Sequence, residues 1–298
     1  MRIAATTATP SRLLTAAGAV TLLAVPFTGQ VVAVGGTASA GPARVAASPA
    51  GSQQAGRAGA AAGSGPPVPG KVLTWSDEFD GGITWGARWV GDRTTAYRYG
   101  DHNPDGNKLD WLDTAGVGVT DGVATFTARP STRRLENGSQ AWQTGFLTTE
   151  GSTEGFRVMV GDYAEARVRM PAGRGAWPAL WTWNGDEGAN GEVDSFEYHP
   201  DNPDLLELTN HVRPAAGYYV DGKAVGADRW VTVGTHYGAD SVDWYVDGAK
   251  VFSDHAGVGA GWSAYLVLNL SVADGQYHPA PSGSVPITFS ADYVRVYR

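Results

Sequence analysis

The order of hydrophobic and polar positions predicts β-strands over much of residues 71–298. Residues 163–170 (YAEARVRM) alternate charged with apolar side chains, a period of two that is typical of a strand with one buried face. Residues 241–246 and 249–252 flank Asp247-Gly248, which predicts a hairpin with an Asp-Gly turn. Further strands are predicted over 123–128 and 291–298. Many short strands without a long helical stripe indicate an all-β sandwich or barrel.

The first 70 residues have a different composition. They contain no Asp, Glu, Lys or Trp, and Arg2 and Arg12 precede and border an apolar run over 13–25. Because this run is shorter than the roughly 20 residues that span a bilayer, we predict a cleaved secretory signal over 1–40 rather than a membrane anchor, with the small-x-small site at 38–40. Residues 41–70, rich in Gly, Ala, Ser and Pro, predict a flexible linker.

Residues 71–298 are therefore expected to form one folded, extracellular domain, and we expect a monomer that has no membrane contact once the signal is removed. The chain has no cysteine, but a domain of this length can hold its core without disulfides. All 30 acidic and 18 of the 22 basic side chains lie in this range, a net charge of −12. Such a charge repels nucleic acid and gives no long-range attraction to anionic polymers, so a neutral polymer is the expected partner.

Residues 191–200 (GEVDSFEYHP) place Glu192, Asp194 and Glu197 within six residues. On a strand, Glu192 and Asp194 share a face, whereas strict alternation sends Glu197 to the other face. One extra residue, a β-bulge, would return Glu197 to the first face, and bulges are frequent near active sites. The alternative is a solvated strand that simply carries acids.

The segment just upstream, 175–183 (GAWPALWTW), favours the active-site interpretation. As a strand it would place Trp177, Trp181 and Trp183 on one face. Alternating tryptophans are more often core residues, but an aromatic floor beside a row of carboxylates is what a sugar-cleaving site needs. With Glu192 ionised nearby, the pKa of Glu197 is expected to rise, which would suit an acid catalyst.

The motif Glu192-Val-Asp194-Ser-Phe-Glu197 resembles the bulged Glu-x-Asp-x-x-Glu signature of glycoside hydrolase family 16. Segments that match other parts of the family pattern lie at 73–80, 144–145, 163–167, 175–181, 244–248, 268–270 and 292–297. The resemblance implies a β-jelly-roll sandwich of two curved antiparallel sheets, of the concanavalin A-like lectin and glucanase type, with a substrate cleft on the concave sheet.

The resemblance also implies residue roles. Glu192 would be the nucleophile and Glu197 the general acid/base of a retaining reaction, with Asp194 hydrogen-bonded to Glu192. The implied substrate-binding residues are Trp177, Trp181, Trp183, Asn210, His211 and Asn269, although His211 is an equally good structural histidine. No cofactor is required, but many members bind calcium away from the cleft, so a structural calcium site with Glu78 and Asp292 is implied.

The expected activity is secreted endo-hydrolysis of a neutral polysaccharide, first β-1,3- or β-1,3-1,4-glucan and second agarose or another galactan. Transglycosylation by the same residues stays open, and the rival from another class is a lectin-like binding protein. The chain departs from the family at Phe146, at 184–191, where Trp-Pro is usual, and at 273–277. These departures leave the polysaccharide undecided. The calcium-loop-like stretch 101–107 lacks its last acidic ligand and is interpreted as an Asx-rich turn.

Overall fold

The computed structural model describes residues 65–185, 191–275 and 278–298. The signal peptide predicted over 1–40 and most of the linker predicted over 41–70 lie outside these residues. The described residues fall in one compact unit. Val68 already packs against a cluster of Tyr163, Tyr245 and Tyr297, so the packed structure extends into the range that was predicted as linker.

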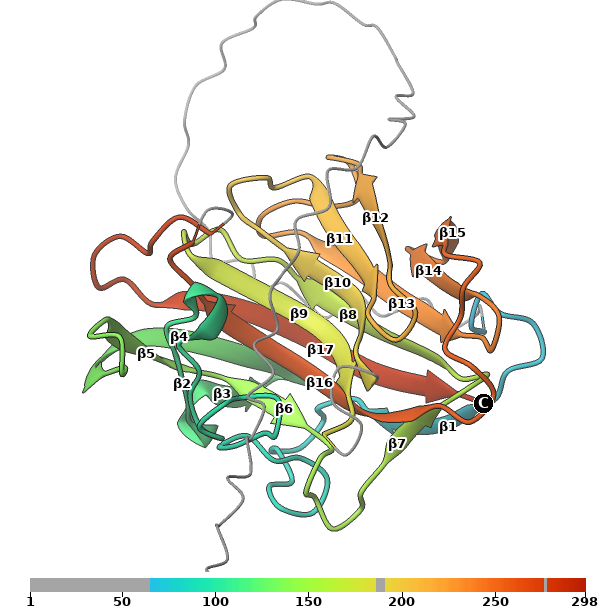
Figure 1. Cartoon of the computed structure of the whole chain (residues 1–298), viewed down its shortest axis with the longest axis horizontal. Helices are drawn as coiled ribbons and strands as arrows, with labels where there is room; N and C mark the ends of the chain where they lie inside the picture. The colour runs from blue at the N-terminus through green and yellow to red at the C-terminus, as the bar shows by residue number, and fades with distance from the viewer. Residues whose placement is uncertain (1–64, 186–190, 276–277) are drawn as a thin grey trace, which may run out of the picture. The chain divides into compact units, whose positions relative to one another are not determined.

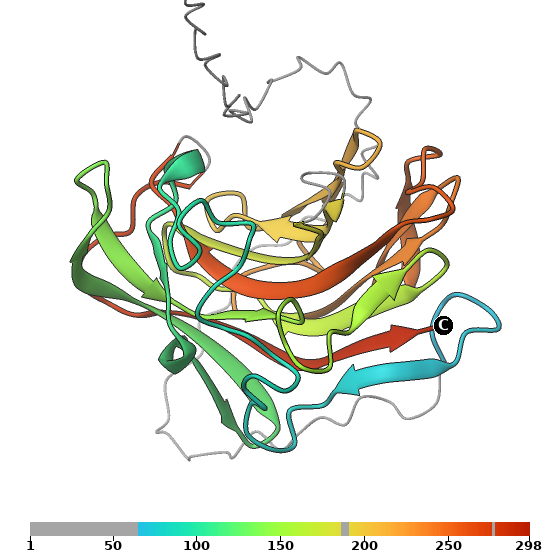
Figure 2. The ribbon, with the colours of Figure 1, turned by 60° about the horizontal axis from the view of Figure 1, so that its bottom comes forward.

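Two β-sheets are stacked face to face in the described part of the chain (Figures 1 and 2). The ten strands of one sheet are β1 (Leu73–Asp77), β2 (Asp110–Leu112), β3 (Val117–Thr120), β4 (Val123–Arg134), β5 (Gln140–Thr144), β8 (Tyr163–Arg169), β13 (Trp230–Tyr237), β14 (Val242–Val246), β15 (Ala249–Ser253) and β17 (Ile287–Tyr297). Its order is β15-β14-β13-β8-β17-β4-β5-β2, with β1 paired to β17 and β3 to β4.

The second sheet has seven strands in the order β12-β11-β10-β9-β16-β6, with β7 paired to β16. They are β6 (Phe146–Thr148), β7 (Arg157–Met159), β9 (Ala176–Trp183), β10 (Val193–Tyr198), β11 (Leu205–Asn210), β12 (Ala215–Val220) and β16 (Ser263–Val272). Its pairs are all antiparallel, and in the other sheet only β2 and β5 run parallel among the described strands. This jelly-roll sandwich confirms the predicted fold class.

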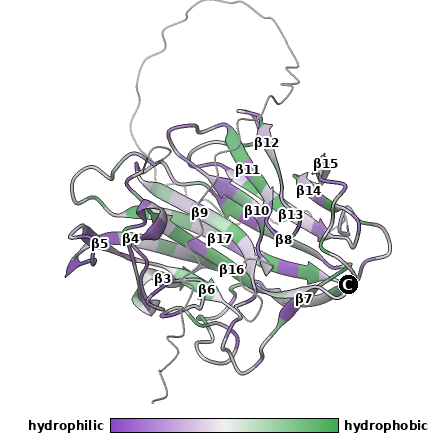
Figure 3. Cartoon of the chain, in the orientation of Figure 1, coloured by the Kyte–Doolittle hydropathy of each residue, from purple (hydrophilic) through white to green (hydrophobic). Residues whose placement is uncertain are grey.

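The core lies between the sheets because the strands alternate as the sequence predicts. Ala164, Ala166 and Val168 of β8 are buried in it, while Arg167 and Arg169 point the other way. Rings from the two sheets meet there, with 6.4 Å between the centroids of Phe196 and Phe289. The alternation is visible as hydrophobic and hydrophilic bands along the strands (Figure 3). We call the face of the seven-stranded sheet that is turned away from this core its outer face, and Figure 2 shows that this face is concave.

Turns and short helices complete the described fold. The predicted hairpin is β14–β15, and both turn residues, Asp247 (φ 47°) and Gly248 (φ 78°), have the positive φ of a type I′ turn. Two 3₁₀ turns are η1 (Asp105–Asn107) and η2 (Thr114–Gly116). None of the described helices has the length and hydropathy needed to cross a membrane. Asn103 Oδ1 accepts from the Asp105 amide, which confirms the predicted Asx turn.

Candidate active site

A register shift in β10 gathers the carboxylates. On β11, Asp194 lies opposite Thr209 and Glu197 lies opposite Glu207, so three steps along β10 match two along β11. The pairing with β9 shifts at the same place, between Asp194 and Phe196. The predicted β-bulge is therefore present. Its consequence is that Asp194 and Glu197 both project from the outer face.

Two core-facing side chains occupy the bulge. Ser195 accepts a 2.8 Å hydrogen bond from the hydroxyl of Thr235 and lies 3.2 Å from the Tyr237 hydroxyl, both on β13 of the other sheet. Phe196 follows it into the core, where it is fully buried. The extra residue is thus held by polar contacts to one sheet and by apolar packing between both.

Glu192, Asp194 and His211 form one cluster at the start of β10. The His211 amide donates to the Glu192 carbonyl at 3.0 Å, and His211 Nε2 lies 3.1 Å from Asp194 Oδ2. One ligand-type atom from each of the three side chains lies within 4.8 Å of the others. The end of β11 therefore fixes the position of Glu192 through the backbone and that of Asp194 through the imidazole.

Burial and neighbouring negative charges raise the pKa values of the two glutamates in the carboxylate row. Burial, and then the charge of Asp194, raise the pKa of Glu192 to about 7, against the opposing effect of His211 and Lys108. Burial, and then Asp194 and Glu207, raise the pKa of Glu197 to about 8, against Lys108 and the hydrogen bond from Trp177. Glu197 therefore keeps its proton at neutral pH more readily than an ordinary glutamate does.

The pKa of His211 is raised as well. Burial alone would lower its pKa, but the hydrogen bond to Asp194 and the charges of Asp194, Glu192 and Glu197 raise the pKa to about 9. The imidazole is consequently protonated at neutral pH and donates to Asp194. The sequence left open whether His211 binds substrate or is a structural histidine. The structure shows that His211 is in direct contact with the carboxylate row.

The predicted tryptophan face is present on β9. Trp177, Trp181 and Trp183 are each partly exposed, while the residues between them, apart from Ala179, face the core. Each indole nitrogen has a defined acceptor: Glu197 Oε1 at 2.8 Å, Asn269 Oδ1 at 2.9 Å and Thr95 Oγ1 at 2.9 Å, in that order. The rings therefore lie beside the carboxylates in fixed orientations.

Trp177 is more enclosed than a simple sugar platform. Lys108 Nζ lies 3.5 Å from the centroid of its ring, and the His278 ring stacks on it at 4.3 Å. Burial lowers the pKa of Lys108, while the charges of Asp110, Glu197, Glu192 and Asp194 act to raise it. Lys108 was not predicted, because it follows the Asx turn on a loop and nothing in its sequence neighbourhood indicates the site.

A buried polar network supports the loop that carries Lys108. Asp110 accepts hydrogen bonds from the Tyr97 hydroxyl at 2.6 Å, the Ser271 hydroxyl at 2.7 Å and the Val272 amide at 2.7 Å. Ser271 also accepts from Asn269 Nδ2 at 2.9 Å. Sequence reasoning missed this network, since its members come together only through the pairing of distant segments.

The two predicted asparagines lie on different faces. Asn269 is on the outer face, between Trp181 and Ser271, where it was expected. Asn210 is fully buried on the core side with Leu206 and Leu208, and its amide donates to Asp254 at 2.6 Å and to the Gly257 carbonyl at 3.0 Å. Asn210 therefore organises a turn. The alternation along β11 is a signal that could have shown this.

Two groups of side chains bear on metal binding. Glu192, Asp194 and His211 are close enough to ligate one ion, and His211 could do so only by releasing the proton that its raised pKa favours. For the implied calcium site, Glu78 pairs with Arg295 at 2.8 Å and Asp292 with Arg167 at 2.9 Å. Two carboxylates engaged with guanidinium groups do not form the oxygen cage that calcium prefers.

The known relatives of this chain agree with the interpretation of the site as a sugar-cleaving one. No model of a known protein family matches the chain. The endo-1,3-1,4-beta-glycanase EglC of Rhizobium meliloti is 30% identical over 187 residues, covering 60% of this chain and 39% of that protein. The beta-glucanase of Rhodothermus marinus is 26% identical over 272 residues, covering 78% of this chain and 86% of that protein. The chain thus spans well under two thirds of the first relative.

Among solved structures, the chain resembles SCLam, a non-specific endo-beta-1,3(4)-glucanase from family GH16, with a TM-score of 0.63 and 23% identity over 76% of this chain and 91% of that one. A mutant of SCLam presents 1,3-beta-D-cellobiosyl-glucose at its active site. The two-sheet fold and the bulged carboxylate row define a jelly-roll protein of the glucanase type. The motif, the relatives and this fold agree with the resemblance to glycoside hydrolase family 16.

Proposed function

We propose that this chain is an endo-acting β-glucanase that hydrolyses β-1,3- or mixed-linkage β-1,3-1,4-glucan by double displacement. The observation that carries the proposal is the bulge of β10, which places Asp194 and Glu197 on one face beside Glu192 and the tryptophans of β9. The activities named for EglC and the Rhodothermus marinus enzyme support the substrate class.

In the first step Glu197 acts as the general acid. It gives its proton to the glycosidic oxygen while a carboxylate oxygen of Glu192 attacks the anomeric carbon from the opposite side of the sugar ring. The carbon–oxygen bond to the leaving saccharide breaks, and a covalent glycosyl ester forms on Glu192. Trp177 holds the Glu197 carboxyl group in place for this transfer through its 2.8 Å hydrogen bond.

In the second step Glu197, now a carboxylate, acts as the base. It takes a proton from water, and the water oxygen attacks the anomeric carbon as the bond to Glu192 breaks. Glu192 returns as a carboxylate, Glu197 regains its proton, and the product keeps the starting configuration. If a sugar hydroxyl replaces water, the same step becomes transglycosylation.

The charges around Glu192 and Glu197 favour the protonation states that these roles require. The Asp194 charge favours the protonated form of Glu197, with a pKa of about 8, while the protonated His211 beside Asp194 favours the ionised form of Glu192. Glu192 has a pKa of about 7, so both required forms coexist near neutral pH. We infer that activity is greatest there.

The test is product analysis by mass spectrometry with laminarin, mixed-linkage glucan, agarose and a sulfated galactan, using the chain and its Glu192→Gln variant. We expect oligosaccharides from one or both glucans, and none from the variant. Products from agarose alone would replace the glucan by a galactan. No product from any polymer, with binding retained, would replace the enzyme by a lectin-like protein.

We also propose that the protein is secreted as a monomer with a signal peptide over 1–40 and a linker ahead of the catalytic domain. The composition of residues 1–70 supports this proposal. The intact mass of the exported protein tests it. A mass that begins after residue 40 is expected, and a mass that retains residues 1–40 would contradict cleavage.

A further inference from the structure

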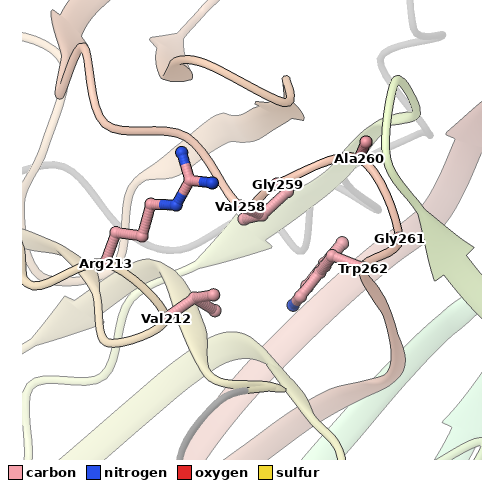
Figure 4. Close-up of a pocket in the computed structure, with 7 residues that line it drawn as sticks. All are labelled: Val212, Arg213, Val258, Gly259, Ala260, Gly261 and Trp262. Atoms are coloured by element: carbon pink, nitrogen blue, oxygen red, sulfur yellow. The ribbon is translucent and has the colours of Figure 1, made fainter.

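Hollows lie at both ends of β11 in the described structure. The larger, of about 320 Å³, is lined by the turn after the strand and by the loop that leads into β16 (Figure 4), and its Trp262 ring stacks on Tyr237 of the other sheet. The smaller, of about 90 Å³, lies at the start of the strand and is lined by His199, Asp201, Asn202, Leu205 and Glu207. The smaller hollow is the one next to the general acid, because Glu207 lies opposite Glu197 in the strand register.

His199, in the wall of the smaller hollow, forms a buried pair with His278 from the loop after β16. The two residues are 6% and 5% exposed, their ring centroids are 4.0 Å apart, and their Nδ1 atoms are 3.1 Å apart. Neither histidine has a part in the two steps of the proposed reaction. A contact of this length between ring nitrogens requires a proton on one of them and a lone pair on the other.

The surroundings determine which nitrogen carries that proton. His278 Nδ1 also lies 3.3 Å from the carbonyl oxygen of Ala176, which can only accept. His278 therefore carries its proton on Nδ1 and donates it to both acceptors in a three-centre hydrogen bond. His199 then carries its own proton on Nε2, which lies 3.6 Å from the carboxylate oxygen Oε1 of Glu207. Burial, and then the nearby His199 and Lys108, lower the pKa of His278 to about 3, which keeps this imidazole neutral.

The pair supports Trp177 from two directions. The His278 ring stacks on the Trp177 ring, with 4.3 Å between centroids and an angle of 23° between the planes. The carbonyl that His278 engages belongs to Ala176, the residue directly before Trp177 on β9. The indole that is held in this way donates to Glu197 Oε1 at 2.8 Å. A displacement of His278 would therefore move the donor that orients Glu197.

We propose that the His199–His278 pair positions the general acid, because it holds the Trp177 indole and, through it, the carboxyl group of Glu197 in the orientation that proton transfer requires. Both histidines are positioning residues, since they act through Trp177. The inference rests on the proposed function, from which the role of Glu197 is taken. Glu207 belongs to the same arrangement, since its charge faces His199 Nε2 and also acts on Glu197.

The proton arrangement is tested without catalysis, by nitrogen-15 NMR of the imidazoles and indoles in the intact chain. We expect the proton on Nδ1 of His278 and on Nε2 of His199. The indole N–H signal of Trp177, assigned by its absence in Trp177→Phe, should shift in His278→Leu. The control is His255→Asn, at an exposed position with a φ of 54° that Asn tolerates, and it should leave this signal in place.

Kinetics on a β-glucan test whether the pair acts through Trp177. His278→Leu should lower kcat by about tenfold while KM changes by less than about twofold. The basic limb of the pH profile should move to higher pH, because the hydrogen bond from Trp177 lowers the pKa of Glu197. In a Trp177→Phe background the same replacement should change kcat by less than about twofold, since the donor is already absent. His255→Asn should leave kcat, KM and the profile unchanged.

Three results would overturn the positioning role: the reverse tautomers, an indole signal of Trp177 that does not move in His278→Leu, or losses of kcat that multiply in the double variant. Thermal unfolding of each variant separates a lower kcat from a lower folded fraction, which would leave the basic limb in place. The outcome is distinguishable from that of the proposed function. A parent chain that cleaves no β-glucan would refute that function, while the imidazole and indole signals would still decide for or against the pair.

Discussion

At the scale of single residues, the site is a balance between acids and cations that share one small region. Asp194 raises the pKa of both Glu192 and Glu197, whereas Lys108 opposes this effect on both. The two influences have opposite signs, so they can be separated by removing one charge at a time. The pH profile of kcat/KM has an acidic and a basic limb, and these limbs report the pKa values of the two catalytic groups.

Lys108→Met should move the whole profile to higher pH. Activity needs ionised Glu192, which sets the acidic limb, and protonated Glu197, which sets the basic limb. Loss of the nearby positive charge raises the pKa of both, so both limbs shift upward and activity below pH 7 falls. Lys223→Met, at an exposed position, is the control and should leave the profile in place. An unchanged profile in the Lys108 variant would rule out its electrostatic role.

Asp194→Asn should have the opposite effect on the pH profile. Without its charge the pKa of Glu197 falls, so the basic limb moves to lower pH, and the pKa of His211 falls with the loss of its partner. We expect kcat/KM at pH 7 to fall by about 10²-fold. A pH–rate profile measured beside an NMR titration of His211 tests both effects. A loss of activity without any movement of the basic limb would reduce Asp194 to a structural residue.

At the scale of elements, the bulge of β10 links the core to the site. Ser195 faces the other sheet and bonds with Thr235 and Tyr237, and this contact fixes the extra residue that brings Glu197 to the outer face. Sequence could predict this bulge, because three acids spaced by two and then three residues share a face only if one residue is extra.

Ser195→Ala should destabilise the fold by about 1–3 kcal/mol, since it leaves two buried hydroxyls without this partner. Urea unfolding with a constant m-value measures this change. Ser284→Ala, at an exposed position, should change the stability by no more than about 0.5 kcal/mol. Equal stability in the two variants would show that the hydroxyl of Ser195 does not hold the bulge.

The alternation along β9 and β11 could be read from the sequence, but only part of the predicted site agrees with it. The period of two placed the tryptophans of β9 correctly, and the same period along β11 contradicts the placement of Asn210 at the substrate, because it shares a face with Leu206 and Leu208. At Asn210 the family pattern and the local alternation disagree, and the structure follows the alternation.

At the scale of the whole molecule, alternation and turn residues were enough to predict an all-β sandwich or barrel, but they do not specify which loops cover the outer face. Lys108, Tyr97 and Asp110 reach the site through a loop far from β10 in the sequence. Lys108 also forms an isolated β-bridge with Ala273, next to β16. Contacts of this range depend on the complete topology, so no local pattern could have revealed them.

The measurement that tests the central claim most directly is the anomeric configuration of the first product, followed by NMR during cleavage of a β-glucan. Double displacement through Glu192 and Glu197 predicts that the β-anomer forms first and then equilibrates with the α-anomer. A first product in the α-configuration would contradict a covalent intermediate on Glu192. It would require one carboxylate to activate a water that attacks the anomeric carbon directly, while the other protonates the leaving glycosidic oxygen.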